Sequence, residues 1–188
     1  MGGPGPGELR ETMSATRLLV LGVVRLHGQA HGYLVSSELE SWEAGQWAGL
    51  RSGSIYHALR QLAKEGLLDT SEVYEWPGRV DYAINEKGEE TFLRLLRSAL
   101  RVPDRRPELL SAALVLLPAL PVAEVIELLK ERVEALDGER EQLVATAREG
   151  RRPRSVAELF DLRAAQAAGE AAWVRNLIGR LERGEEPV

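Results

Sequence analysis

The chain has 188 residues, of which 44% are apolar, and a formal net charge of −5 at pH 7. This predicts one ordinary folded domain, or one small domain with a helical extension. The absence of cysteine excludes disulfides, thiolate metal sites and thiol catalysis and fits a reducing cytoplasm, and the longest apolar runs, 18–24 and 112–117, fall short of the roughly 20 residues of a membrane helix.

Acidic residues outnumber basic ones in both halves of the chain. Residues 1–101 hold 13 Asp and Glu against 11 Lys and Arg, and residues 102–188 hold 16 against 13. Neither half is a basic domain, so any affinity for nucleic acid has to come from a local patch. We therefore expect a cytoplasmic protein without a membrane partner, in which residues 1–12, rich in Gly and Pro, form a disordered lead.

Three helices are predicted in the first part of the chain. Apolar clusters predict helices over Arg17–Leu26 and Tyr33–Ala44, separated by a loop at 27–32 that contains two glycines. A Gly-punctuated connection over 45–53 leads to a third helix, Ser54–Glu65. Ser52 or Ser54 is expected to cap its start, and Gly66 to end it.

A β-hairpin and a fourth helix follow. Residues 67–74 and 80–84 are extended and flank a turn at 76–79, which predicts the hairpin. Asn85 then caps a helix over 86–100. Three helices followed by a hairpin are the order of a winged helix-turn-helix, in which the hairpin is the wing.

The remainder of the chain is predicted to be helical. Beyond a charged, Pro-containing linker at 101–107, apolar positions repeat at four-three spacing over 122–147, interrupted only by Arg140, and again over 160–181. The two helices can cover each other as an antiparallel hairpin. Extra apolar positions widen the apolar face, which favours burial against a second chain. These positions are Val125, Leu128, Leu159, Leu162, Trp173 and Leu177.

The expected protein is therefore mainly α with a small β-hairpin. It divides into the lead at 1–12, a winged-helix DNA-binding domain at 13–100, the linker at 101–107 and a coiled-coil-like dimerisation domain at 108–188. The residues expected to carry the dimer are Phe160, Ala167, Ala171, Val174, Ile178 and Leu181.

The third predicted helix is the main candidate for a binding surface. Ile55, Leu59 and Leu62 share one stripe that faces the core. On the opposite face, Arg and Gln side chains suit base edges in a DNA major groove, and Lys suits phosphate. An ordinary solvated helix presents a similar face, so the pattern alone does not decide. The candidate contacts on or just before this face are Arg51, His57, Arg60, Gln61 and Lys64.

The predicted hairpin favours DNA binding. Its tip ends in a cation, Arg79, which is the wing residue best placed to contact phosphate or the minor groove. The nearby acidic residues Glu72, Glu75 and Asp81 oppose DNA binding unless they point away or pair with Arg79.

Several short motifs follow one another in a specific order and spacing over roughly residues 17–100. They are Leu21-Gly22, His31-Gly32-Tyr33, Gly53-Ser54-Ile55-Tyr56 with Leu59 and Leu62, Glu65-Gly66-Leu67-Leu68, Tyr82, and Glu86-Lys87-Gly88. This pattern resembles the PadR family of transcriptional regulators, and the Gly-Ser-Ile-Tyr, Glu-Gly-Leu-Leu and Glu-Lys-Gly motifs together are a specific combination. The downstream helices resemble the family's C-terminal dimerisation region less specifically.

The resemblance implies a homodimeric regulator, expected to be a repressor, whose third helices enter successive major grooves of a roughly palindromic operator. It also implies phosphate contacts from Ser52, Ser54 and Tyr56, and base or backbone contacts from Arg60 and Lys64.

Two positions depart from the family's pattern. His57 stands where proline is common, and Ala63 stands where an acidic residue is usual. His57 is either a base contact or an idle surface histidine.

No constellation typical of an enzyme or a metal site is present. His27 and His31 flank glycines and lack a third ligand, and no phosphate loop, nucleophile elbow or metalloprotease helix occurs. We expect no enzyme activity, no metal and no cofactor.

Two interpretations stay open beside the DNA-binding one. Trp42 and Trp47 are either core or hinge anchors or, as in some members of the family that the chain resembles, the lining of a pocket for a small aromatic effector. The whole winged helix is alternatively a module that binds protein rather than DNA, which the net acidity suits.

Overall fold

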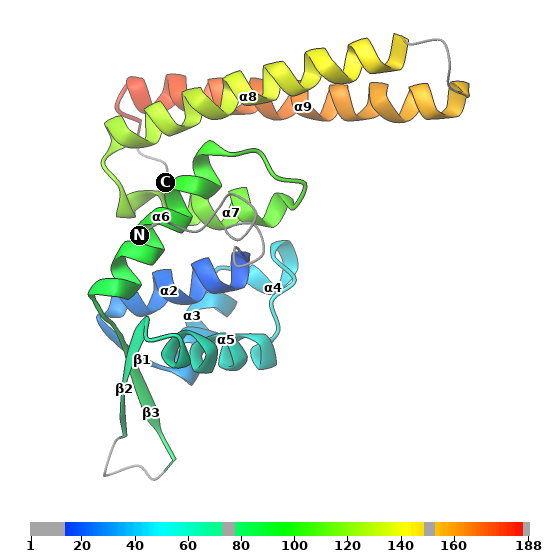
Figure 1. Ribbon diagram of the computed structural model, residues 1–188. Helices are drawn as coiled ribbons and strands as arrows, with labels where there is room; N and C mark the ends of the chain where they lie inside the picture. The colour runs from blue at the N-terminus through cyan, green and yellow to red at the C-terminus, as the bar shows by residue number, and fades with distance from the viewer. Residues whose placement is uncertain (1–13, 73–77, 149–152, 186–188) are drawn as a thin grey trace, which may run out of the picture. The chain divides into compact units, whose positions relative to one another are not determined.

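The computed structural model describes residues 14–72, 78–148 and 153–185, so the predicted lead at 1–12 and most of the wing tip lie outside the described residues. The protein is mainly helical, with one small antiparallel sheet. Its residue contacts divide it into two compact units (Figure 1). One comprises Met1–Arg97 with Arg106–Leu116, and the other Ser98–Arg105 with Leu117–Val188.

The first unit is a winged helix, as the sequence predicts. Its sheet has the order β1-β3-β2, with both pairs antiparallel, and the β2–β3 hairpin projects past α5 as a wing (Figure 1). The elements are α2 (Ala15–His27), β1 (Gln29–His31), α3 (Gly32–Ser41), α4 (Ala44–Trp47), α5 (Ser52–Lys64), β2 (Leu68–Glu72), β3 (Val80–Ile84), α6 (Glu86–Arg101) and α7 (Pro107–Val115).

Helix α2 forms the centre of this unit. Ser14 caps its start, since the Ser14 hydroxyl accepts a hydrogen bond from the Arg17 backbone N–H at 3.2 Å. Residues 18–24 are buried without a polar face, because α2 packs against α3, α5, α7 and strands β1 and β3. A helix that is apolar all round is what the core of such a unit requires.

Several predicted boundaries differ from the structure. The loop predicted at 27–32 contains β1, a three-residue strand whose pairing with β3 local sequence does not show. The helix predicted over Tyr33–Ala44 ends at Ser41, and the connection predicted over 45–53 contains most of α4. The break lies at Glu43, which has a φ of 54°. The N-cap of α5 is Arg51 rather than Ser52 or Ser54.

Helix α7 packs with the winged helix, although the sequence assigned 108–188 to a separate helical region. Leu109, Ala112 and Ala113 are buried. Leu116 packs against Gly22 of α2, where a Cβ would lie 2.5 Å from the Leu116 Cδ2. Because Gly22 has no side chain, Leu116 can pack directly against α2 at this position.

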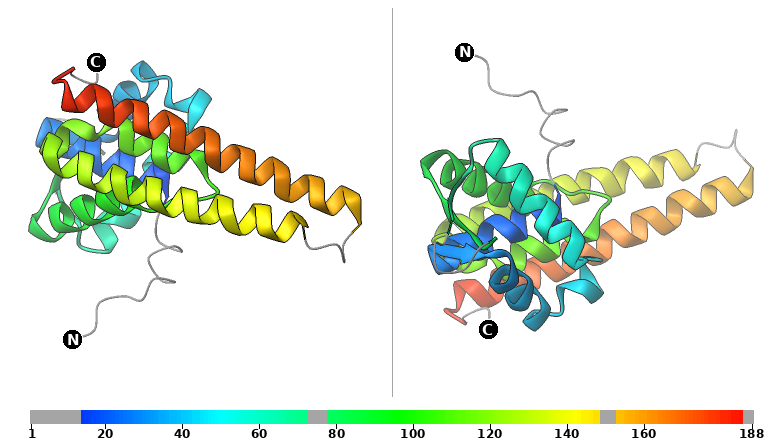
Figure 2. Two further views of the ribbon diagram at one scale, coloured as in Figure 1. Left: turned by 90° about the horizontal axis from the view of Figure 1, so that it is seen from above. Right: turned by 90° about the horizontal axis from the view of Figure 1, so that it is seen from below.

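The second unit is dominated by two long helices. The 3₁₀ turn η1 (Leu117–Ala119) leads into α8 (Val122–Arg148), and α9 (Arg154–Glu182) returns beside it as an antiparallel hairpin (Figures 1 and 2). Leu136, Ala167 and Ala171 form a buried cluster between them. None of the helices within the described ranges is long and apolar enough to span a membrane.

Candidate nucleic-acid interface

Helix α5 separates a buried stripe from an exposed polar face. Ile55, Leu59 and Leu62 are at most 3% exposed. The predicted contacts Arg51, Ser52, Ser54, Tyr56, His57, Arg60 and Lys64 are all exposed, and Gln61 is half-buried.

The two cations of this face, Arg60 and Lys64, have no charged partner among the described residues. The face therefore offers two free positive charges, one turn apart, to a polyanion.

The first turn of α5 is held by a local hydrogen-bond pair. The Ser54 hydroxyl accepts from the Arg51 backbone N–H at 3.1 Å and donates to the Arg51 carbonyl at 2.6 Å. A serine has one hydroxyl hydrogen, so Ser54 has to leave Arg51 before it donates to a phosphate. The Ser52 side chain is exposed at the same end of the helix.

Residues at the start of α6 donate hydrogen bonds to the backbone directly after α5. The Lys87 ammonium donates to the Glu65 carbonyl at 2.8 Å, and the Asn85 amide donates to the Gly66 carbonyl at 3.2 Å. Asn85 also caps α6, as predicted, by accepting from the Gly88 N–H at 3.0 Å. The Glu-Gly-Leu-Leu and Glu-Lys-Gly motifs thus meet in space, and their contacts fix the direction of α5.

Glu65, the first carboxylate after the exposed face, forms an ion pair within the unit. Arg17 of α2 donates to its two carboxylate oxygens at 2.9 and 2.6 Å. This hydrogen-bonded pairing with Arg17 lowers the pKa of Glu65 below its usual value, against the opposing effect of partial burial. Its charge is thus balanced by Arg17 rather than left to oppose Lys64.

A close contact joins α5 to the start of α3. The Tyr56 ring lies over Gly32, where a Cβ would come within 2.2 Å of the Tyr56 Cε1 atom. The His31 ring caps α3, because its Nδ1 accepts from the Leu34 backbone N–H at 3.1 Å. Because Gly32 of the His-Gly-Tyr motif has no side chain, it leaves the space that Tyr56 of the Gly-Ser-Ile-Tyr motif occupies.

Arg79, the predicted wing contact, lies just before β3, at the outer end of the described part of the wing. Its guanidinium donates to the two carboxylate oxygens of Asp81 at 2.8 and 3.2 Å. The hydrogen bond from Arg79 lowers the pKa of Asp81 and raises that of Arg79 itself. Asp81 pairs with Arg79, one of the two ways in which the acidic residues of the wing were expected to be accommodated, while Glu75 lies outside the described residues.

Residues 20–94 match the model of the transcriptional regulator PadR-like family. The winged helix of this chain is therefore similar to that of this family. Every motif on which the resemblance rests, from Leu21 to Gly88, falls within the matched range. This family consists of transcription regulators rather than enzymes.

Solved structures similar to the chain include PadR-like regulators. The chain is similar to Bacillus subtilis PadR in complex with operator DNA (16% identity, 89% of this chain and 98% of that chain, TM-score 0.42). It is also similar to Bacillus subtilis PadR in complex with p-coumaric acid (16%, 91% and 97%, 0.40) and to a PadR-like regulator from Bacillus cereus (21%, 90% and 99%, 0.37). A comparison with curated proteins found no match.

Trp42 and Trp47, the predicted effector contacts, lie at the corner between α3 and α4 of the winged helix. The Trp47 indole N–H donates to the Trp42 carbonyl at 2.8 Å, and both side chains are half-buried. No group of three potential metal ligands occurs among the described residues. His27 instead lies 3.2 Å from a Glu38 carboxylate oxygen.

Most of the residues predicted to carry a dimer are already buried within one chain. Phe160 is half-buried, whereas the apolar side chains left most exposed on α9 are Leu159, Leu162 and Trp173, at 52%, 56% and 45%. The predicted dimer residues that the single chain buries are Ala167, Ala171, Val174, Ile178 and Leu181.

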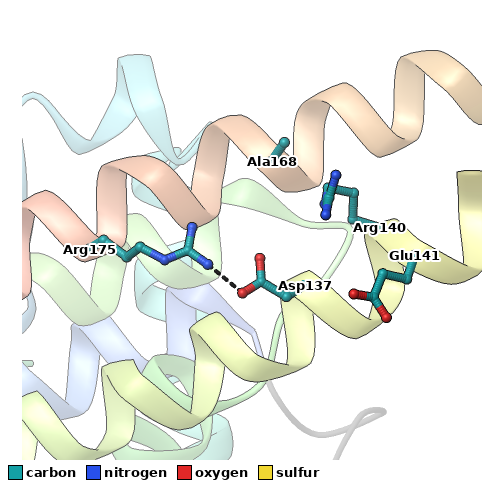
Figure 3. A pocket seen from close by; sticks show the side chains of 5 residues that line it. All are labelled: Asp137, Arg140, Glu141, Ala168 and Arg175. Atoms are coloured by element: carbon teal, nitrogen blue, oxygen red, sulfur yellow. Dashed lines mark hydrogen bonds and ion pairs between the residues drawn. The ribbon is translucent and has the colours of Figure 1, made fainter.

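The position that interrupts the predicted seam of α8 lies beside a polar hollow. Arg140 lines a space of about 370 Å³ together with Asp137, Glu141, Ala168 and Arg175. Figure 3 shows the Arg175 guanidinium meeting the Asp137 carboxylate across the two helices. Arg140 is exposed at the edge of the hairpin, which explains why the apolar series breaks there.

Proposed function

We propose that this PadR-like chain is a sequence-specific, DNA-binding transcriptional repressor that acts in the cytoplasm and binds a palindromic operator as a homodimer. The observation that carries the proposal is the exposed face of α5. It presents Arg60 and Lys64 without ion-pair partners in the described part of the chain, and half-buried Gln61 lies beside them. Arg and Gln side chains suit base edges, and Lys suits phosphate.

The net charge makes this local patch decisive. With a net charge of −5, the chain as a whole repels DNA, so binding depends on a few cations and on the counterions that they displace. Affinity should therefore fall steeply as salt rises.

The test is a titration of a fluorescent duplex from the chain's own upstream DNA at several salt concentrations. Replacing both Arg60 and Lys64 with alanine should abolish binding while leaving the oligomeric state unchanged. The matched control replaces Lys130 and Arg154, exposed cations of α8 and α9, and should bind like the unaltered chain.

One outcome would favour the competing function. If the unaltered chain binds no DNA even at low salt, the winged helix is better explained as a protein-binding module, the alternative that the net acidity suits.

The homodimer is supported by the exposed apolar residues of α9. A C2 dimer buries the same patch of both chains against itself, and Leu159, Leu162 and Trp173 provide apolar area for this purpose. Two α5 helices in successive major grooves would be about 34 Å apart.

A small aromatic effector that releases the operator completes the proposal, with Trp42 and Trp47 as its contacts. Both indoles are half-buried rather than enclosed, so a planar ligand that stacks on them should change their fluorescence. The check is a titration with planar aromatic acids, followed by tryptophan emission and melting temperature. Unchanged emission and melting temperature across the panel would count against this site.

A further inference from the structure

Asp81 is the only buried carboxylate in the part of the chain that the structure describes. It is 9% exposed and lies in β3, the central strand of the sheet, between His31 of β1 and Ser71 of β2. A buried carboxylate costs free energy unless it is paired, and aspartate is depleted in strands. The packing of the sheet therefore does not account for an aspartate at this position.

The carboxylate of Asp81 is paired with Arg79. The Arg79 Nε and Nη2 atoms donate to its two oxygens at 2.8 and 3.2 Å, and the Gln29 amide nitrogen lies 3.5 Å from one of these oxygens. The hydrogen bond from Arg79 lowers the pKa of Asp81. Asp81 is therefore ionised at neutral pH, and its charge cancels that of Arg79.

The geometry of the pair leaves Arg79 able to bind a partner in one orientation. A guanidinium carries more N–H groups than the two that point at Asp81, and the Arg79 side chain is still 41% exposed. The remaining N–H groups can contact DNA from a fixed position. Because the pair is neutral, such a contact displaces no counterion, unlike a contact from the free charges of Arg60 and Lys64.

We propose that Asp81 is a specificity-determining residue of the wing, which prevents Arg79 from attracting arbitrary DNA and holds its guanidinium for one contact in the operator complex. The inference rests on the proposed DNA binding and concerns the selectivity of that binding. Non-specific affinity for DNA comes almost wholly from unpaired cations, and specificity is the difference between the affinities for the operator and for other sequences. Keeping Arg79 neutral therefore lowers non-specific affinity and raises selectivity.

The experiment measures binding of Asp81→Asn and of the unaltered chain to the upstream duplex and to a scrambled duplex of the same length, at several salt concentrations. Asparagine has nearly the same shape as aspartate but no charge, so Arg79 regains a free positive charge. We expect the scrambled duplex to be bound about three- to tenfold more tightly at low salt, and the slope of log affinity against log salt to steepen by about one. The upstream duplex should gain less, because Arg79 is no longer held in one orientation, so the ratio of the two affinities should fall.

Three further variants serve as controls. Glu72→Gln removes a negative charge from the exposed part of β2 without changing the Arg79 pair, and should leave the ratio of affinities unchanged. Asp81→Glu keeps the charge and should keep the ratio as well. Asp81→Thr removes the charge with a residue that suits a central strand, and should repeat the effect of Asp81→Asn even if the asparagine variant does not fold. Circular dichroism melting checks the folding of each variant.

The outcomes separate this inference from the proposed function. If loss of the Asp81 carboxylate changes the ratio of affinities no more than Glu72→Gln does, the inference is wrong while DNA binding stands. If its loss weakens both duplexes equally, Asp81 supports affinity rather than selectivity, and the inference is again overturned. If the unaltered chain binds neither duplex at low salt, the proposed function itself fails.

Discussion

Gly88 shows how single residues set the geometry of the winged helix. A Cβ at this position would lie 2.1 Å from the Leu67 carbonyl oxygen and 2.8 Å from Cγ1 of Ile84, and a backbone oxygen directly before β2 has little room to move. Gly88→Ala should therefore destabilise the fold by about 1–3 kcal/mol.

Gly138 provides the matched control for this prediction. It lies inside α8, where a Cβ would meet nothing within 4 Å, so Gly138→Ala should stabilise the fold by about 0.5–1 kcal/mol. Thermal unfolding followed by circular dichroism should show shifts of opposite sign. Equal shifts for both variants would contradict the close approach at Gly88.

The Arg17–Glu65 ion pair makes the stability of the winged helix depend on pH. Because Arg17 lowers the pKa of Glu65 in the folded chain, the pair stabilises the fold above the unfolded carboxyl pKa of about 4.3. This contribution is lost as the pH falls through the lower, folded pKa. Glu65→Gln should therefore be less stable than the unaltered chain at pH 7, and the gap should close in acid. Urea unfolding over a pH series checks this, and a gap of constant size would contradict it.

At the scale of elements, the sequence predicts the orientation and the bounds of those helices and strands that have a clear local pattern of apolar residues. The stripe of Ile55, Leu59 and Leu62 gave the orientation of α5, and alternation gave the bounds of β3. Strand β1 was missed because three residues show no period, and its formation depends on β3.

The sequence also could not show how residues distant along the chain meet. The placement of α7 depends on the absence of a side chain at Gly22, against which Leu116 packs. The contact of Gly32 with Tyr56 brings two motifs together. Residue spacing alone does not reveal such contacts. The sequence therefore predicted the candidate DNA contacts but not the packing contacts that hold these residues in place.

Helix α9 carries a prediction about assembly. If its exposed apolar residues form the dimer surface, Leu162→Glu should place a charge in that surface and yield a folded monomer, because Leu162 is 56% exposed in the single chain. Ala145→Glu, which adds the same charge on the exposed side of α8, is the control and should remain a dimer. Sedimentation velocity distinguishes the two states, and a dimeric Leu162→Glu protein would place the interface elsewhere.

At the scale of the whole molecule, the second unit includes more of the chain than the helical hairpin. Most of α6 belongs to the first unit and its last residues, from Ser98, to the second. There Arg132 of α8, only 2% exposed, donates to the Ala99 and Val102 carbonyls at 3.0 and 2.9 Å. Its Nε donates to Glu170 of α9 at 2.7 Å. One buried guanidinium thus joins the end of α6 to both helices of the hairpin.

Removal of this guanidinium should weaken the second unit selectively. Arg132→Met fills similar space but leaves three backbone carbonyls and the Glu170 carboxylate without their donor, which costs about 3–5 kcal/mol for a buried pair. The first unit keeps its own core around α2, so denaturant unfolding should separate into two transitions. Glu170→Gln, which leaves the carbonyl contacts of Arg132 in place, should be milder because Glu170 is 32% exposed. If Arg132→Met unfolds in one unshifted transition, the end of α6 is held by other contacts.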